Sequence, residues 1–283
     1  MKSLQDPHLH QQFSKSGPGL VALDTSAAPP DQIRPVEIKV EFCKHREKLE
    51  RVMKDLKIND IEAPDEIKHE LIALLERCLA AFAEDDDDVG QTNLVEHTIV
   101  LRDEQTTIKQ RARPVPYAVR DFVEKEIDRL LKLGIISPAD PGKCPFASPI
   151  VVVSKKDATW RMCVDFRQLN DQTIKDVYPL PRIDEIFTSL HGANCFVALD
   201  LLMGYHQIAV AEIDKPKTAF ITHRGLFVYN KMPFGLCNAP ANFQRLMDSI
   251  YREHLGRDTT AYLDDFLSFA TNFTWYSPLL KET

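Results

Sequence analysis

The chain has 283 residues, of which 44% are hydrophobic and 27% charged, a composition typical of a globular protein with one large or two modest domains. No apolar run reaches the length of a membrane span and the first residues contain no apolar signal core, so the sequence predicts a soluble intracellular protein without a membrane partner. The net charge of −7 argues against a uniformly basic nucleic-acid-binding surface. Residues 102–182 nevertheless carry 15 Lys and Arg against 11 Asp and Glu, which leaves room for a phosphate-binding surface there.

The N-terminal third resembles a leader more than a domain. Residues 1–60 include the stretches "SGPG" and "TSAAPPDQIRP" and contain few apolar clusters, which argues against a core of their own. Residues 64–82 predict a helix, because apolar side chains recur at helical spacing and Pro64 suits a first helical position. The acidic run at 84–88 predicts a solvated loop.

Strands and helices then alternate irregularly. The predicted elements, in order, are a strand within 93–101, a helix over 116–134, strands over 148–156 and 160–166 joined by a basic hairpin, a helix over 181–192, a buried strand over 195–201, a helix within 236–256 and a hairpin over 261–270. Because they do not form regular βαβ units, the predicted fold class is α+β.

Two adjacent aspartates, Asp264 and Asp265, interrupt the apolar sequence of the last hairpin. Carboxylates about 4 Å apart repel by roughly 4 kcal/mol at the effective dielectric of a protein surface. A hairpin tip accommodates one of them, whereas a divalent cation would offset the repulsion between both. The second interpretation needs a third ligand, and Asp200, at the end of the predicted strand, is the candidate. Such oxygen ligands suit Mg²⁺ or Mn²⁺.

Eight motifs occur in an order that identifies a family. The motifs are "LLKLGIISP", "CPFASPIVVVSKKD", "WRMCVDFRQLN", "YPLPRIDEI", "LDLLMGYHQI", "KTAF", "MPFGLCNAPANFQRLMD" and "YLDD". Together they make residues 94–270 resemble the reverse transcriptase of gypsy-class long-terminal-repeat retrotransposons. The resemblance implies an RNA-directed DNA polymerase with a right-hand fold, in which fingers and palm interleave and the palm is a small antiparallel sheet backed by helices.

The resemblance also implies roles for individual residues. Asp200, Asp264 and Asp265 match the catalytic carboxylates that hold two Mg²⁺ (or Mn²⁺) ions for nucleotidyl transfer to a primer 3′-hydroxyl. The implied partners are an RNA or DNA template with its primer and deoxynucleoside triphosphates. The nucleotide-binding positions of the family are matched by Lys155, Lys156, Arg161, Tyr205 and Phe234. Of these, Tyr205 would exclude a ribose 2′-hydroxyl, and either lysine could accompany Arg161 at the triphosphate. Gln207, Asn238 and Pro240 match motif positions expected to be scaffold or to lie near the template.

The implied boundaries are a leader over 1–90 with one helix, fingers over about 94–177 and 208–238, and palm over about 178–207 and 239–272. Three features depart from the family. Met203 stands where Ser is common, and Ala158 replaces the usual hairpin glycine, so that either its φ is less unusual or the turn differs. Only 18 residues follow Asp265, and 273–283 form an aberrant tail in place of a thumb. The alternative function is therefore a catalytically weak remnant that acts at most as a binding module.

Overall fold

The structure is a computed structural model that describes residues 35–61, 63–156 and 158–271, with side chains from residue 45 onward. These residues fall into two compact units. The small unit contains residues 35–88, 192–196 and 269–271, and the large unit contains residues 89–191 and 197–268. Within these ranges, no helix combines the length and apolar character needed to cross a membrane. The predicted tail over 273–283 lies outside the described residues.

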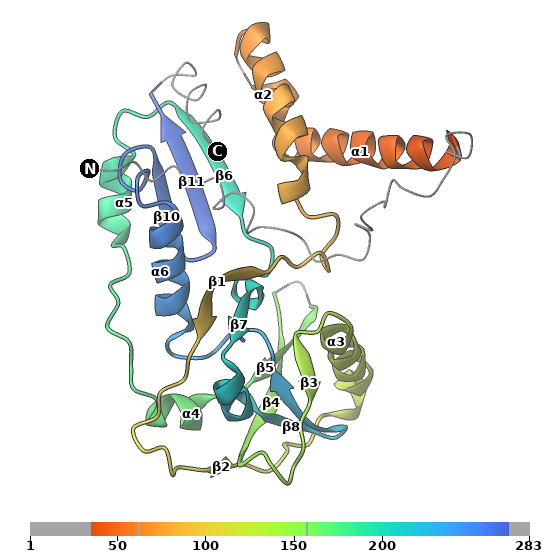
Figure 1. Ribbon diagram of the computed structural model, residues 1–283, viewed down its shortest axis with the longest axis vertical. Helices are drawn as coiled ribbons and strands as arrows, with labels where there is room; N and C mark the ends of the chain where they lie inside the picture. Colours follow the sequence, from red (N-terminus) through yellow and green to blue (C-terminus); the bar gives the residue numbers. More distant parts are fainter. Residues whose placement is uncertain (1–34, 62, 157, 272–283) are drawn as a thin grey trace, which may run out of the picture. The chain divides into compact units, whose positions relative to one another are not determined.

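The small unit contains two helices, α1 (Pro35–Asp55) and α2 (Asp65–Cys78), each followed by a single 3₁₀ turn (Ile58–Asp60 and Leu79–Ala81) (Figure 1). Helix α2 confirms the helix predicted over 64–82, although Pro64 precedes its first turn instead of occupying it. Helix α1 was not predicted, and two of its apolar side chains share a small core with α2 and the turns that follow the two helices. Leu49 and Val52 of α1 pack with Leu75, Leu79 and Ile58 in a small apolar cluster. The acidic run at 84–88 forms a loop, as predicted.

The main sheet of the large unit is built around β4 (Phe146–Ser154) (Figure 1). The first half of β4 pairs in parallel with β2 (Ile108–Lys109) and β8 (Phe220–Thr222), and its second half pairs antiparallel with β5 (Trp160–Val164). The sheet continues from β8 to β9 (Gly225–Tyr229) and β3 (Ile136–Pro138). The β4–β5 pair confirms the predicted basic hairpin.

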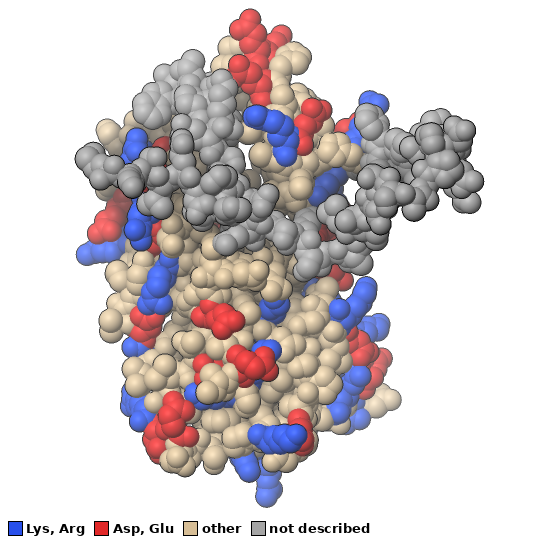
Figure 2. All heavy atoms as spheres, viewed as in Figure 1, with Lys and Arg blue, Asp and Glu red and all other residues tan. Residues whose placement is uncertain are grey.

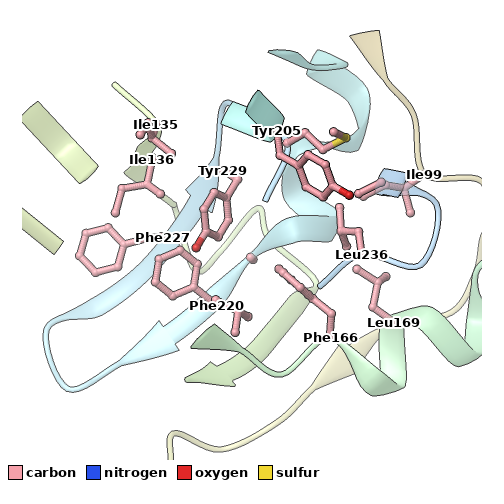
Figure 3. Close-up of a cluster of buried hydrophobic side chains, with 14 of the residues drawn as sticks. Ile99, Ile135, Ile136, Phe166, Leu169, Tyr205, Phe220, Phe227, Tyr229 and Leu236 are labelled. Carbon is pink, nitrogen blue, oxygen red and sulfur yellow. The ribbon is translucent and has the colours of Figure 1, made fainter. Parts of the chain in front are cut away.

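The core of the large unit lies against this sheet. Phe220, Phe227 and Tyr229 pack ring against ring, and Figure 3 shows them close to Ile135 and Ile136. Helix α3 (Arg120–Lys132), preceded by a 3₁₀ turn at Tyr117–Val119, buries its apolar face and ends before Gly134, whose φ of +65° suits a helix terminus. The predicted helix over 116–134 is thereby confirmed.

A second, three-stranded sheet carries the aspartate motif. Its strands run in the order β10 (Thr259–Tyr262), β11 (Asp265–Ala270) and β6 (Cys195–Asp200). Helix α6 (Ala239–Ile250) packs against β10 and also against β1 (Thr92–His97), which pairs with β7 (Ile208–Val210). The short helices α4 (Arg167–Gln172) and α5 (Ile183–Ser189), together with 3₁₀ turns at Gly204–Gln207 and Glu212–Thr218, complete the unit.

Strand β6 was predicted to be buried, and this prediction was wrong. Phe196 is 52% exposed and Leu199 is 39% exposed. The reason is position, because β6 is an edge strand that pairs with β11 along one side only, among the described strands. An apolar sequence therefore identified the strand correctly but not its burial.

Candidate active site

The two aspartates of the motif lie at the tip of the β10–β11 hairpin. Tyr262 pairs with Asp265, so that Leu263 and Asp264 alone form the turn. Leu263 has a φ of +54°, a left-handed conformation that costs a residue with a side chain about 1–2 kcal/mol. Such strain persists where the surroundings fix the backbone. Here the Leu201 N–H donates to the Asp264 carbonyl at 3.3 Å, which ties the turn to the residue after Asp200.

Asp264 occupies an unusual environment for a carboxylate. Its Oδ1 atom is buried and has no hydrogen-bond partner. Burial, followed by repulsion from Asp200 and then from Asp265, raises its pKa to about 6. The two other motif carboxylates are therefore close enough to act on Asp264 electrostatically, and both are exposed. The arrangement leaves one buried oxygen without a partner beside two more carboxylates.

The fit of these residues to a divalent cation rests on the unpartnered oxygen and on the chemistry of the donors. Three carboxylates supply the hard oxygen ligands that Mg²⁺ and Mn²⁺ prefer, and a cation would give the buried Oδ1 a partner. Within the described part of the chain, however, no three His, Cys, Asp or Glu side chains are already arranged as a metal-ligand cluster. The three-carboxylate metal site therefore stays a prediction.

Gly204, which the sequence did not single out, lies close to the Asp264 carboxylate. A Cβ atom at position 204 would lie 3.0 Å from Asp264 Oδ1 and 2.9 Å from the Phe243 ring. At 2.9 Å from the Phe243 ring, a Cβ atom would fit only if neighbouring atoms shifted. The glycine of "LMGYHQ" is thus required for a steric reason, which a substitution at this position would reveal.

Three of the predicted nucleotide-binding residues form one column. Tyr205 stacks on Phe234 with ring centroids 4.8 Å apart, and the Arg161 guanidinium carbon lies over the Phe234 ring, 5.2 Å from its centroid. Tyr205 is only 7% exposed, and burial, then Asp264 and Tyr262, raises its pKa to about 12. Phe234, at 40% exposed, presents the accessible aromatic surface of this column.

Lys155 and Lys156 are exposed at the tip of the β4–β5 hairpin, which also carries Arg161. In the same turn, Ala158 has a φ of +61°. The suggestion that its φ would be less unusual than that of a glycine was therefore wrong. The hairpin keeps the left-handed conformation because the Ala158 N–H still donates to the Lys155 carbonyl and the Lys155 N–H to the Thr159 carbonyl.

The remaining motif residues make structural contacts. Asn238 donates to the Ile174 carbonyl at 2.8 Å and accepts from the Asp176 N–H at 3.0 Å, which holds the segment before α5 against the start of α6. Gln207 donates to the Leu202 carbonyl at 3.0 Å, and Pro240 lies in the first turn of α6. These contacts fit the scaffold alternative. Met203, beside them, also has a positive φ, of +49°.

The face shown in Figure 2 does not present one continuous basic surface. Lys and Arg side chains are interspersed there with Asp and Glu side chains. Several charged groups elsewhere are paired within the fold: Asp165 accepts from both Arg113 and Arg167, and the side chain of Lys217 pairs with buried Asp214 at 2.9 Å. These charged side chains therefore have structural roles within the fold.

Comparison with known proteins identifies the family. Residues 153–275 match the family described as reverse transcriptase (RNA-dependent DNA polymerase). The chain is 39% identical over 221 residues to the retrovirus-related Pol polyprotein from transposon gypsy of Drosophila melanogaster, covering 76% of this chain and 21% of that protein. It is 44% identical over 174 residues to the Pol polyprotein from transposon opus of the same organism, covering 60% of this chain and 17% of that protein. The chain thus spans about a fifth of the length of these relatives.

Solved structures show the same fold. The chain superimposes on the foamy viral protease-reverse transcriptase in complex with an RNA/DNA hybrid with a TM-score of 0.72 and 22% identity, over 82% of this chain and 31% of that one. A structure of the protease-reverse transcriptase dRH in complex with double-stranded DNA gives the same TM-score and identity, over 83% of this chain and 40% of that one. The predicted α+β polymerase fold is confirmed. Residues 153–275 thus match the reverse transcriptase family, and the chain is similar to the Pol polyproteins of gypsy-class retrotransposons.

Proposed function

We propose that this chain carries the nucleotidyl-transfer centre of an RNA-directed DNA polymerase, with Asp200, Asp264 and Asp265 as its catalytic carboxylates. The observation that carries the proposal is the buried, unpartnered Oδ1 of Asp264 at a strained hairpin tip, under the electrostatic influence of the other two aspartates. A two-residue hairpin turn accounts for the positive φ of Leu263, but not for neighbouring carboxylates of which one has a buried oxygen without a partner. A divalent-metal site for phosphoryl transfer would account for these carboxylates.

The three aspartates would hold two Mg²⁺ or Mn²⁺ ions. When bound, these ions supply charge neutralisation at the transferring phosphoryl group and activation of the attacking hydroxyl. The contribution of the chain itself is positioning: the hairpin turn directs Asp264, and the end of β6 carries Asp200 beside it. In reactions of this type, positioning and electrostatic stabilisation provide most of the rate enhancement.

The proposed substrates are a deoxynucleoside triphosphate and a primed RNA or DNA template. Arg161 would bind the triphosphate, since a planar guanidinium matches phosphate oxygens, and Lys155 or Lys156 would add a second cation from the exposed hairpin. Phe234 would contact the nucleotide, with Tyr205 buried behind it. Sugar discrimination by Tyr205 would therefore act through the position of Phe234 as well as through its own ring. Foamy viral relatives solved with an RNA/DNA hybrid and with double-stranded DNA support nucleic acid as the partner.

The alternative of a remnant that only binds a partner predicts a different outcome in one experiment. Purified chain at high concentration and low salt is mixed with a 5′-labelled primer on an RNA template, Mg²⁺ and deoxynucleotides, under single-turnover conditions. We expect primer extension by the wild-type chain and a loss on the order of 100-fold or more in Asp264→Asn. Asp184→Asn, an exposed aspartate on α5, is the matched control and should extend the primer normally. Equal incorporation by wild type and Asp264→Asn, or none by either, would support the remnant.

A further inference from the structure

Gln244, in the middle of α6, lies beside the catalytic hairpin and is fully buried. Its side-chain amide contacts three groups. Nε2 donates to the Ala261 carbonyl at 3.1 Å and to Asp248 Oδ1 at 2.8 Å, and Oε1 accepts from the Leu263 N–H at 3.1 Å. One side chain therefore bonds both to the last turn of α6 and to the backbone on either side of Tyr262.

The orientation of this amide is fixed by its partners. A carbonyl oxygen and an ionised carboxylate only accept hydrogen bonds, so both require the NH₂ end of Gln244. The amide oxygen must then face the Leu263 N–H. Asp248 is held in turn by the Tyr178 hydroxyl, which donates to Oδ2 at 2.6 Å. Tyr178 belongs to the segment before α5, so the hydrogen-bond chain runs from that segment through α6 to the hairpin.

The end of this chain is the residue whose backbone is strained. Leu263 has a φ of +54°, and Asp264 follows it directly. A hydrogen bond to the Leu263 N–H restrains the peptide plane at the start of the two-residue turn, and the direction of the Asp264 side chain depends on that turn. We propose that Gln244, oriented by Asp248, is a positioning residue that fixes the Leu263–Asp264 turn and thereby the direction of the Asp264 carboxylate. The proposal deepens the proposed function and rests on it.

The competing explanation is that Gln244 only fills space in the core. A space-filling role predicts that an apolar residue of similar volume changes stability without changing the turn. A positioning role predicts that the turn itself loosens, and that altering Asp248, which does not touch the turn, has the same effect at lower amplitude.

The first test measures hydrogen exchange at the Leu263 amide in metal-free protein. We expect Gln244→Leu to lower protection of this amide at least tenfold, and Asp248→Asn to lower it less, because an asparagine at 248 no longer dictates the orientation of Gln244. The control is Ser268→Ala, which removes the contact between Ser268 and Thr259 elsewhere in the same hairpin. This control should leave the protection of the Leu263 amide unchanged. Unchanged protection in Asp248→Asn and Gln244→Leu would overturn the proposal, and if Gln244→Leu fails to fold, Asp248→Asn alone decides.

The second test measures the affinity of the same variants for Mn²⁺ alone, from the electron paramagnetic resonance signal of the free ion. Asp264→Asn first identifies binding at the proposed centre. We expect the Mn²⁺ affinity of Gln244→Leu to be about tenfold lower than that of wild type. We also expect the double variant Gln244→Glu/Asp248→Asn, in which donor and acceptor are exchanged, to recover part of the Mn²⁺ affinity that Gln244→Glu alone loses. Loss of stability with unchanged Mn²⁺ affinity would overturn the proposal. Equal Mn²⁺ affinity of wild type and Asp264→Asn would instead contradict the proposed function. Hydrogen exchange at the Leu263 amide would still test the positioning role of Gln244.

Discussion

The large unit contains two hairpin turns in which a residue with a side chain adopts a left-handed conformation, and they differ in what surrounds them. In the β4–β5 turn, Ala158 (φ +61°) is exposed and is restrained by hydrogen bonds within the hairpin. In the β10–β11 turn, Leu263 (φ +54°) is half-buried and is restrained by Gln244 from a neighbouring helix. The comparison teaches that similar local strain can be held in two ways. The first turn is restrained only within its own hairpin at the surface, whereas the second is restrained by a buried side chain and carries the carboxylate that we propose to be catalytic.

Acidification should have the largest effect, because two histidines are buried in the large unit. His97 Nδ1 accepts from the Asn242 side-chain amide of α6, and His206 Nδ1 donates to the Met232 carbonyl. Burial lowers the pKa of each histidine to about 4. Because the folded-state pKa lies below the unfolded value of 6.5, the unfolded chain binds protons first, and stability falls as the pH drops from about 6.5 to 4. The loss amounts to at most about 3 kcal/mol for each histidine.

Urea denaturation between pH 7.5 and 4 measures this loss. The raised pKa of Asp264 acts in the opposite direction between about pH 6 and 4, since the folded state then binds the proton first. His97→Gln should flatten the pH dependence, whereas replacement of the exposed His69 on α2 should not. A pH profile that is identical in wild type and His97→Gln would contradict the assignment of neutral, buried His97.

Gly204→Ala tests the β10–β11 turn, because Gly204 lies close to the Asp264 carboxylate. The added Cβ would collide with the Phe243 ring and Asp264 Oδ1, so we expect a loss of about 1–3 kcal/mol in the free energy of unfolding. Displacement of the carboxylate by about 1 Å should also lower primer extension on the order of 100-fold. Gly142→Ala, at an exposed turn where a Cβ would meet only the Asp140 side chain, is the control. Normal extension by Gly204→Ala would show that the turn tolerates movement.

Ala158→Gly tests the surface turn, where the strain has no support from the core. Glycine adopts a positive φ without steric cost, and the lost methyl group is exposed, so we expect an increase of about 1 kcal/mol in the free energy of unfolding. Thermal or urea denaturation measures the change. Destabilisation by Ala158→Gly would mean that the turn is not strained as its φ indicates.

The smallest effect is expected at Phe234, whose ring contacts Arg161 of β5 and Tyr205. Phe234→Leu removes a cation–π contact worth about 0.5–1 kcal/mol at a partly exposed site, so KM for the deoxynucleotide should rise about two- to fivefold with kcat unchanged. Phe234→Tyr keeps the ring and should behave as wild type. Equal KM values for Phe234→Leu and wild type would indicate that Arg161 does not depend on this ring.

The fold could largely be predicted from sequence because it depends on local patterns, whereas the catalytic role of the three aspartates stays a prediction. Runs of apolar and β-branched residues located β4, β5 and β10–β11, and the order of the motifs pointed to the family. Burial could not be predicted in the same way, since β6 has an apolar sequence but lies at a sheet edge. Helix α1 was missed although Leu49, Val52 and Met53 follow helical spacing, because charged residues surround them in the sequence.

The contacts that orient the site were missed for a different reason. Gln244 contacts Ala261 and Leu263, which lie far along the chain, and Gly204 contacts Asp264 only through the tertiary fold. The one available signal was a polar residue next to Phe243 on the buried face of a strongly amphipathic helix. A residue of this kind needs hydrogen-bond partners, but the sequence does not name them.

The most direct test of the central claim is a crystal structure of the chain with a template–primer and Mn²⁺, with the ions located from their anomalous scattering. The account predicts Mn²⁺ at the β10–β11 turn, with Asp264 Oδ1 among its ligands and with Asp200 and Asp265 completing the protein contribution. Ordered Mn²⁺ elsewhere in the protein, with Asp264 Oδ1 still without a partner in the presence of the template–primer, would contradict the claim that these three aspartates form one catalytic metal centre.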